Sequence, residues 1–252
     1  MIEIDLRATV KSNLPVIDEI LGEGFSAGLH LVSGASATAK SAFLLQVAQK
    51  SEVPAIFLNT EMNNRDLVKR LVTITTEVEL NKIATLPSDE RSRLSQETVN
   101  QNTHLTIEDG NSGFVSINLL KNRIADIVEA SNPDTVLLVI DSFNEWVNTA
   151  KDHFEVSDKE VRAKLKTELI DLSKEFNVTI LISAQKKDSE RETIEELEFA
   201  ANSHLVFSWE RSGRADAEGN KHLNIFFKKN RGGESGKNKI VKFRGELQRF
   251  SQ

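Results

Sequence analysis

Short runs of apolar residues recur along the chain, and most of them lead into a turn or into a stretch with helical periodicity. Runs of this length, bounded by polar residues, predict buried strands. The four predicted strands occupy residues 29–32, 55–58, 136–140 and 178–182. Amphipathic stretches between them predict helices at residues 41–50, 117–130 and 161–176. Strands that alternate with helices indicate an α/β fold, with a mostly parallel sheet flanked by helices.

The pattern changes toward the C-terminus. Apolar runs at residues 205–209, 224–227 and 239–243 are joined by polar turns rich in glycine, which leave no room for helices. These runs predict a C-terminal antiparallel meander. Two earlier segments, residues 86–103 and 148–159, are polar, and each predicts either a small helical excursion or a mobile surface loop.

The length of 252 residues suits a single α/β domain over residues 1–252, with residues 1–13 as a candidate N-terminal arm. The chain has no cysteine and its five histidines are scattered, so any metal ion would be held by oxygen. The net charge of −6 counts against a surface coated with positive charge for non-specific nucleic-acid binding. No signal peptide is visible, and no apolar run reaches the roughly 18 residues of a membrane span. We therefore expect a soluble, cytoplasmic protein that makes no membrane contact.

A phosphate-binding loop is predicted where the first strand turns into the first long helix. The signature of such loops is G-x-x-x-x-G-K-[ST], and its eight positions here are Gly34, Ala35, Ser36, Ala37, Thr38, Ala39, Lys40 and Ser41. Backbone N–H groups and the positive end of the helix dipole bind a triphosphate at such a turn. Lys40 would reach the β- and γ-phosphates of ATP or another nucleoside triphosphate, and the Ser41 hydroxyl would ligate Mg²⁺. The alternative is an ordinary strand-turn-helix with an exposed lysine.

Ala39 departs from this signature, which has glycine at that position. Glycine takes a positive φ without strain and lets the backbone approach a phosphate closely. Alanine would have to take a negative φ or carry strain. The departure favours the hypothesis of a module that binds a nucleotide without hydrolysing it.

An acidic residue, Asp141, ends the third predicted strand. The largely apolar run over residues 135–140 delivers it to the C-terminal edge of the sheet, where ligands of open parallel sheets bind. An aspartate there can hold the water shell of Mg²⁺. Alternatively, the side chain ends the strand by capping the next turn. Its place downstream of the phosphate loop favours a magnesium site shared with Ser41.

Several segments resemble one family of ATPases. Residues 14–28 are similar to the "LDxLLGGGLxxG" lead into the phosphate loop of DnaB-family hexameric replicative helicases, a lead that KaiC and RadA share. Residues 57–62 are similar to the family's "FSLEM" strand end. The predicted helix that follows has three residues at matching places, namely Leu67, Arg70 and Leu71. The chain thus resembles the RecA-like ATPase domain of that family, colinearly over residues 14–250.

The resemblance implies roles for two residues at strand ends. Glu61 would polarise the attacking water, and a carboxylate at the sheet edge near the γ-phosphate can orient and deprotonate water. Alternatively, Glu61 is an acid at a helix N-terminus, where the dipole favours it. Residues 180–185 are similar to the family's "ALSQL" strand end, which implies that Gln185 senses the γ-phosphate.

Residues 228–236 are similar to the family's "KxRxGxxG" hairpin, which reaches into the nucleotide site of the neighbouring subunit. The resemblance implies a homo-oligomer, a hexamer in the family, in which Lys229 and Arg231 supply positive charge in trans. An arginine finger stabilises charge on the transferred phosphoryl group, and it makes hydrolysis depend on assembly. The alternative is a solvated basic hairpin at the edge of the sheet.

The loops expected to contact DNA depart most from the family. Residues 186–198 lack the family's glycine-flanked "LRESG" element, and acids outnumber bases among them. A channel that tracks a phosphate backbone needs lysine and arginine with few carboxylates. The candidate contacts to single-stranded DNA are Lys186, Lys187, Arg191 and Lys151. Because only residues 1–13 precede the resemblance, we expect any ring to form without the family's N-terminal helical domain.

Three hypotheses follow. The first is a Mg²⁺-dependent ATPase that forms a ring and moves on single-stranded DNA as a helicase or translocase in replication or recombination. The second is a regulatory or scaffolding ATPase in the manner of KaiC or RadA, without unwinding activity. The third is the non-hydrolysing module, which Ala39 favours. The presence of Glu61, Asp141, Gln185 and Arg231 together counts against the third, because such a module has no chemical need for all four.

Overall fold

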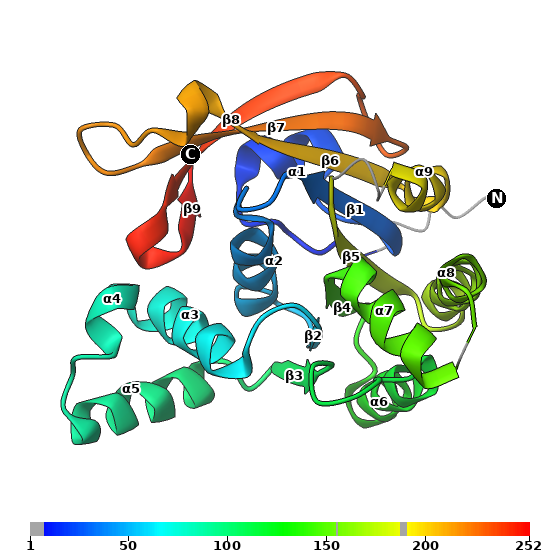
Figure 1. Cartoon of the computed structure of the whole chain (residues 1–252), viewed down its shortest axis with the longest axis horizontal. Coiled ribbons are helices and arrows are strands. Elements are labelled where there is room, and N and C mark those ends of the chain that lie inside the picture. The colour runs from blue at the N-terminus through cyan, green and yellow to red at the C-terminus, as the bar shows by residue number, and fades with distance from the viewer. Residues whose placement is uncertain (1–7, 155, 187–190) are drawn as a thin grey trace.

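The computed structural model describes residues 8–154, 156–186 and 191–252, with the backbone alone described at Arg191, Arg211 and Ser212. In these residues the chain forms nine strands: β1 (Gly28–Gly34), β2 (Ala55–Asn59), β3 (Leu105–Asp109), β4 (Val136–Asp141), β5 (Val178–Gln185), β6 (Ser203–Trp209), β7 (Lys221–Asn230), β8 (Lys237–Arg244) and β9 (Arg249–Ser251). All of them join one sheet in the order β3-β2-β4-β5-β1-β6-β7-β8-β9 (Figure 1).

The helices of the described residues connect and cover these strands. They are α1 (Pro15–Leu21), α2 (Lys40–Gln49), α3 (Asn64–Thr76), α4 (Leu80–Ile83), α5 (Ser88–Gln101), α6 (Ile117–Ser131), α7 (Phe143–Phe154), α8 (Asp158–Glu175) and α9 (Arg191–Ala200), with 3₁₀ turns at Glu210–Gly213 and Gly245–Leu247. In Figure 1, α6, α7 and α8 gather on one side of the molecule, and α3, α4 and α5 form an outlying group on the other. None of the helices in the described part of the chain combines the length and the apolar character needed to cross a membrane.

The sheet confirms the predicted α/β fold with a mostly parallel sheet and a C-terminal antiparallel meander. The strands from β3 to β6 run parallel to one another, and β7, β8 and β9 continue antiparallel. The first run predicted for the meander belongs to both parts. It forms β6, which pairs in parallel with β1 and antiparallel with β7. The change of direction therefore occurs at a single strand in the middle of the sheet.

Two hydrophobic cores cover the two faces of the parallel strands. Strand β4 shows why, because its side chains are all buried and alternate between the faces. Leu137 and Val139 join the core under α2 and α3. Leu138 and Ile140 join the core under α6, α7 and α8. The continuous apolar run of the sequence is the mark of a strand buried on both faces.

Helix α2 was predicted to be amphipathic, and this expectation was wrong. Every residue from 42 to 48 is buried, because α2 packs against the parallel strands and is also contacted by α3 and by the C-terminal strand β9. The ring of Phe43 packs edge-on against Phe207 and Phe250, with centroid distances of 5.2 and 5.8 Å. The side chain of Gln46 accepts a hydrogen bond from the backbone N–H of Phe250 at 2.7 Å. The helix that begins at the phosphate loop is therefore held on all sides.

The polar segments predicted as excursions or loops are largely helical. Residues 88–101 form α5, and residues 148–159 contain the end of α7 and the start of α8. Helix α5 buries only Leu94 and Thr98, and Leu94 packs with Val72 and Ile83 in a small third core. A helix that packs against a single neighbouring helix needs only one row of buried side chains, and its other positions can be polar.

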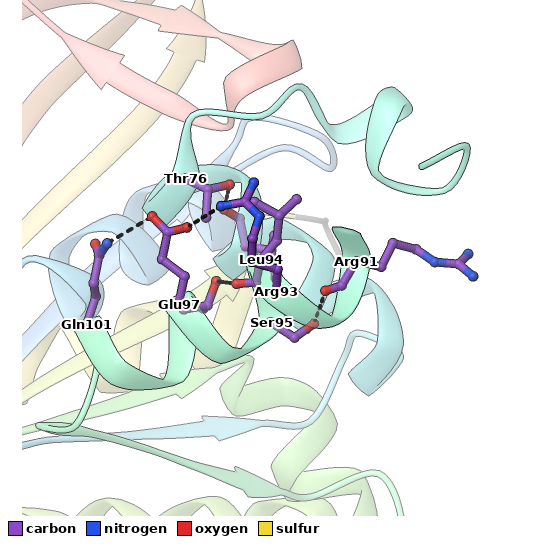
Figure 2. Close-up of polar contacts among 9 residues, drawn as sticks. Thr76, Arg91, Arg93, Leu94, Ser95, Glu97 and Gln101 are labelled. Atoms are coloured by element: carbon purple, nitrogen blue, oxygen red, sulfur yellow. Dashed lines mark hydrogen bonds and ion pairs between the residues drawn. The ribbon is translucent and has the colours of Figure 1, made fainter. Parts of the chain in front are cut away.

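Polar contacts along α5 explain how so hydrophilic a stretch holds its shape. Figure 2 shows Glu97 between Arg93 and Gln101, whose nitrogen atoms lie 3.5 and 3.2 Å from its carboxylate oxygens. The hydroxyl of Ser95 donates to the carbonyl of Arg91 at 2.9 Å in the same view. The two side-chain pairs of Glu97, each spaced by four residues, stabilise the helix by a few tenths of a kcal/mol, about 0.2–0.5 each, whereas the Ser95 bond only satisfies its hydroxyl.

Candidate nucleotide-binding site

A groove lies at the C-terminal edge of the parallel strands, where the loop after β1 meets the ends of β2 and β5. Its volume is about 310 Å³. The residues that line it are Ser36, Ala37, Thr38, Ala39, Lys40, Ser41, Glu61, Met62, Arg70 and Gln185. The structure therefore brings most of the predicted phosphate loop together with the predicted catalytic acid and the predicted sensor. This edge of an open parallel sheet is where ligands bind.

The backbone of the loop has the shape that glycine-containing phosphate loops need. At Gly34, an added Cβ would lie 2.6 Å from the carbonyl oxygen of Phe207 and 2.7 Å from Oγ1 of Thr38, so no side chain fits there. Ala37 and Ala39 both take left-handed conformations, with φ of 58° and 57°. Of the two outcomes expected at Ala39, a negative φ or strain, the structure has the strained one. Left-handed backbone at an L-residue costs roughly 1–2 kcal/mol.

The N-terminus of α2 offers donors to an anion. Its N-cap residue is Ala39, and no side chain caps the first turn. The first N–H groups of a helix lack partners inside the helix, and the dipole there favours negative charge. The ammonium group of Lys40 donates to the carbonyl oxygens of Gly34 and Ala35, at 3.2 and 2.9 Å. Burial lowers the pKa of Lys40, and the charges of Glu61 and Asp141 oppose that shift.

Asp141, at the end of β4, is the buried acid of the site, with 1% of its surface exposed. The hydroxyl of Ser183 donates to its Oδ1, and its Oδ2 has no hydrogen-bond partner among the described residues. Burial raises the pKa of Asp141, while the hydroxyls of Ser183 and Ser41 and the charge of Lys40 oppose the shift. A buried carboxylate oxygen without a partner carries a desolvation cost that a bound cation would relieve.

These residues fit Mg²⁺, which prefers oxygen ligands and usually keeps several waters. Asp141 and Ser41 would supply a carboxylate from the end of β4 and a hydroxyl from the start of α2. In the described residues no three or more His, Asp or Glu side chains are grouped to hold a metal ion alone. The remaining ligands would come from water and from phosphate oxygens.

Glu61 follows β2 and is exposed in the groove. The preceding residue, Thr60, ties β2 to the end of β4, because its backbone N–H donates to the carbonyl of Asp141 at 2.8 Å. The pKa of Glu61 is raised because the groove walls desolvate its carboxyl group and because Asp141 lies nearby; Ser142 and Lys40 oppose the shift. A carboxylate with a raised pKa is a better base near neutral pH.

Arg70 lines the groove, although the resemblance to the family gives it only a matching place in a helix and no role. It lies on α3, whose buried side chains include Leu67, Leu71 and Ile74. Position 70 is three residues beyond Leu67, so Arg70 lies beside the row of buried side chains on α3. Its long side chain reaches the groove from there. Burial lowers the pKa of Arg70, while Asp141, among other carboxylates, opposes the shift. An arginine next to an apolar helical stripe was the signal available in the sequence.

Of the four candidate DNA contacts, the structure describes the side chains of Lys186 and Lys151. Lys186 is exposed, and its backbone N–H donates to the carbonyl of Gly34 at 2.8 Å. Lys187 lies outside the described residues, and Arg191 is described by its backbone alone. Lys151 was expected on a loop, but it lies on α7 with its ammonium 3.0 Å from Asp158. Its charge is already paired within the chain.

The hairpin between β7 and β8 lies away from the groove. Lys229 donates to the carbonyls of Glu198 and Phe199 at 2.6 and 2.9 Å, and Arg231 donates to that of Phe199 at 3.2 Å. Both cations therefore rest on the C-terminal end of α9, where carbonyl groups and the helix dipole favour positive charge. Burial and the charge of Arg231 lower the pKa of Lys229, and Glu198 opposes the shift.

Strand pairing fixes which edge of the sheet this hairpin occupies. Asn230, at the end of β7, pairs with Ser203 at the start of β6. Phe207, near the end of β6, pairs with Gly34 at the phosphate loop. The hairpin is thus at the N-terminal edge of the parallel strands, roughly 15–20 Å along the strand direction from the groove. Arg231 cannot serve the groove of its own chain.

Comparisons with known proteins agree with this architecture. Residues 9–252 match the family described as "DnaB-like helicase C terminal domain". The chain is 25% identical to the Replicative DNA helicase DnaB of Mycoplasma pneumoniae, over 90% of this chain and 54% of that relative. The chain thus spans about half the length of this relative.

Solved structures show the same fold. One structure described as an ATPase domain superposes with a TM-score of 0.79 at 15% identity, and the match covers 98% of this chain and 92% of that one. A DnaB-like replicative helicase, described together with its interactions with primase, gives a TM-score of 0.77 at 15% identity, covering 98% and 62%. Because the family match runs over nearly the whole sequence, the chain belongs to the DnaB-like helicase C-terminal domain family.

Proposed function

We propose that this chain is a Mg²⁺-dependent ATPase of the DnaB-like RecA class that forms a ring, a hexamer by analogy with the family, and moves along single-stranded DNA. The observation that supports this most is the groove, where Lys40, Ser41, Glu61 and Gln185 converge beside the buried Asp141. The relative from Mycoplasma pneumoniae carries the name of a replicative DNA helicase, which is the source of the proposed activity on DNA.

The chemistry proposed for the groove follows from its charges. A triphosphate would lie on the loop and on the N-terminus of α2, and Lys40 would exchange its two carbonyl acceptors for phosphate oxygens. Ser41 and Asp141 would hold Mg²⁺, which when bound supplies positive charge next to the phosphate oxygens. Glu61 would orient a water and accept its proton as the water oxygen bonds to the γ-phosphorus and ADP leaves.

Two further residues would complete each site. Gln185, at the end of β5, would contact the γ-phosphate and pass its presence to the segment that follows. Arg231 would come from a neighbouring copy, because its own groove is at the other edge of the sheet. Its guanidinium would stabilise charge on the phosphoryl group during transfer, with Lys229 beside it.

The test is steady-state hydrolysis of ATP by the purified protein with Mg²⁺ at low salt, with and without single-stranded DNA. We expect turnover that DNA stimulates. Glu61→Ala should lower turnover about 10²–10⁴-fold, the range for loss of a general base. Lys40→Ala should abolish nucleotide binding, and the matched control Asp89→Ala, at an exposed acid on α5, should behave as wild type. Unchanged affinity in Lys40→Ala would refute the phosphate-loop assignment.

A regulatory or scaffolding ATPase in the manner of KaiC or RadA is the second candidate. The ion pair between Lys151 and Asp158 favours it, because the aspartate offsets the attraction of one of the few basic candidates for a DNA phosphate. This candidate predicts turnover that depends on Glu61 and is the same with and without DNA. Binding without turnover would instead support the module that does not hydrolyse nucleotide, with Ala39 as the cause.

A further inference from the structure

Trp209, the last residue of β6, contacts the phosphate loop directly. Its indole N–H donates to the carbonyl oxygen of Ala37 at 2.9 Å. The ring is fixed by neighbours: the ammonium of Lys221 lies 5.6 Å from its centroid, and the ring of Phe243 lies 5.9 Å away. At Gly213, an added Cβ would lie 3.1 Å from the indole, so the chain passes close to the ring there. The donor is therefore held in place before any ligand binds.

The loop of this chain needs such a donor more than a loop with glycine would. Ala37 and Ala39 are both left-handed, and no glycine lies between Gly34 and Lys40. Alanine favours right-handed or extended backbone, so the loop tends to rotate the peptide that follows Ala37. A hydrogen bond to the carbonyl of that peptide opposes the rotation.

The same bond sets the direction of a donor for the nucleotide. In a trans peptide the N–H of Thr38 points opposite to the C=O of Ala37. The carbonyl points to Trp209 on β6, so the N–H points to the other flank of β1. That flank carries β5, β4 and β2, whose ends place Gln185 and Glu61 at the groove. The bond thus turns a backbone N–H toward the position of the phosphates.

We propose that Trp209 is a positioning residue, which holds the alanine-containing phosphate loop in its anion-binding shape through the bond from its indole N–H to Ala37. The proposal rests on the proposed function, since it requires that the groove bind a nucleotide. A tryptophan that only satisfies its own N–H and packs a half-buried ring would stabilise the fold without affecting the loop.

The experiment is a double-mutant cycle read by calorimetric titration with ADP and Mg²⁺. Trp209→Phe keeps an aromatic ring and removes the donor, and we expect it to weaken binding about three- to tenfold, the effect of losing one hydrogen bond. In the Ala37→Gly background the same change should weaken binding less than about twofold, because glycine takes a positive φ without the bond. Equal losses in both backgrounds, or no loss in the first, would overturn the proposal.

The second tryptophan provides the matched control. The indole of Trp146 on α7 donates to the carbonyl of Val115 at 2.8 Å, in the core on the other face of the sheet. Trp146→Phe should lower the melting temperature and leave the affinity for ADP unchanged. If the wild-type protein binds no ADP with Mg²⁺, the proposed function fails; if it binds and Trp209→Phe binds equally well, only this inference fails.

The Trp146→Phe protein also serves if Trp209→Phe does not fold. Trp209 is then its only tryptophan, and its emission reports on the indole at the loop. We expect saturating ADP with Mg²⁺ to shift that emission, because a phosphate on the loop alters the carbonyl that the indole contacts. An unchanged spectrum at full occupancy, measured by calorimetry, would overturn the proposal.

Discussion

At Ala39 the backbone is left-handed, and glycine would relieve that strain. The unfolded chain gains freedom from the same substitution, which offsets part of the gain. We expect Ala39→Gly to raise the free energy of unfolding by up to about 1 kcal/mol. The matched control is Ala163→Gly, at an exposed position inside α8, which should lower it by about 1 kcal/mol. Urea denaturation measures both, and a loss in both variants would contradict the assigned strain.

His30, buried in β1, gives the protein a predictable response to acid. Its Nε2 lies 2.8 Å from the carbonyl of Ser26 and its Nδ1 lies 2.8 Å from the hydroxyl of Ser203, so the neutral ring donates to one and accepts from the other. Burial lowers the pKa of His30 to about 4. The unfolded chain therefore binds more protons between about pH 6.5 and pH 4.

We accordingly expect the contribution of His30 to the free energy of unfolding to be level above about pH 6.5 and to fall as the pH drops toward 4. The contribution of His30 to that fall is roughly 3 kcal/mol. In His30→Gln the slope of stability against pH should be shallower, whatever its absolute stability. The control for the histidine-to-glutamine change itself is His153→Gln, at an exposed position on α7. Equal slopes in wild type and His30→Gln would contradict the burial argument.

At the scale of elements, the sequence pattern predicts the central strands better than it predicts the elements at the periphery of the fold. The four predicted core strands are present because each is buried on both faces and so forms a largely apolar run, interrupted only by His30 in β1 and Thr179 in β5. Strand β3 was missed because it is an edge strand of mixed exposure, and its pattern carries no such run. For residues 86–103 the sequence predicts either a helical excursion or a loop and does not decide between them, because only two residues of α5 are buried. An element that packs against only one neighbour therefore has a weak hydrophobic pattern in its sequence.

The groove shows the same division. Lys40 was predicted from the phosphate-loop signature, and Glu61 and Gln185 from the resemblance to the family; each follows a predicted strand, and parallel strands deliver their ends to one edge. Arg70 and Trp209 reach the loop and groove from a helix face and from the end of β6. For Arg70 the apolar stripe of α3 was the local signal, whereas the approach of Trp209 depends on tertiary packing that no local pattern encodes.

Helix α8 offers a test at this scale, because its N-terminus has a full capping box. The side chain of Ser157 accepts from the backbone N–H of Glu160, and the Glu160 side chain accepts from that of Ser157. We expect Ser157→Ala to lower the free energy of unfolding by about 1 kcal/mol. Ser92→Ala, at an exposed position inside α5, should be neutral or slightly stabilising. Thermal unfolding compares the two, and equal effects would mean that the cap contributes nothing.

At the scale of the whole molecule, the groove lies at the C-terminal ends of the parallel strands, and the hairpin with Arg231 lies at their N-terminal ends. An arginine finger in this position can act only on another copy. Arg231→Ala should therefore spare nucleotide binding and depress hydrolysis. Glu61→Ala should be inactive because it lacks the group proposed to accept the proton of the attacking water. Mixed one to one, the two variants should recover activity at interfaces that combine an intact Glu61 with an intact Arg231.

Each variant is half of the mixture, and an active interface needs Glu61 from one variant and Arg231 from the other. With random assembly, about a quarter of the sites should therefore recover if the finger is supplied in trans. The control mixture pairs Arg231→Ala with the double variant Glu61→Ala/Arg231→Ala, in which no interface has both groups. Recovery there, or none in the first mixture, would contradict the geometry.

Strand β6 belongs to both halves of the sheet. One end carries Trp209 beside the phosphate loop, and the other pairs at Ser203 with the strand that leads to Arg231. Hydrogen-bonded strands with buried faces deform little, so β6 would transmit a displacement of the loop to the hairpin, through a pairing with β7 that shifts register between His204 and Leu205. In a closed ring, any rotation that one nucleotide imposes on its subunit would displace the arginine offered to the next nucleotide. The order in which the sites around the ring hydrolyse ATP would then follow from the movements of neighbouring subunits alone.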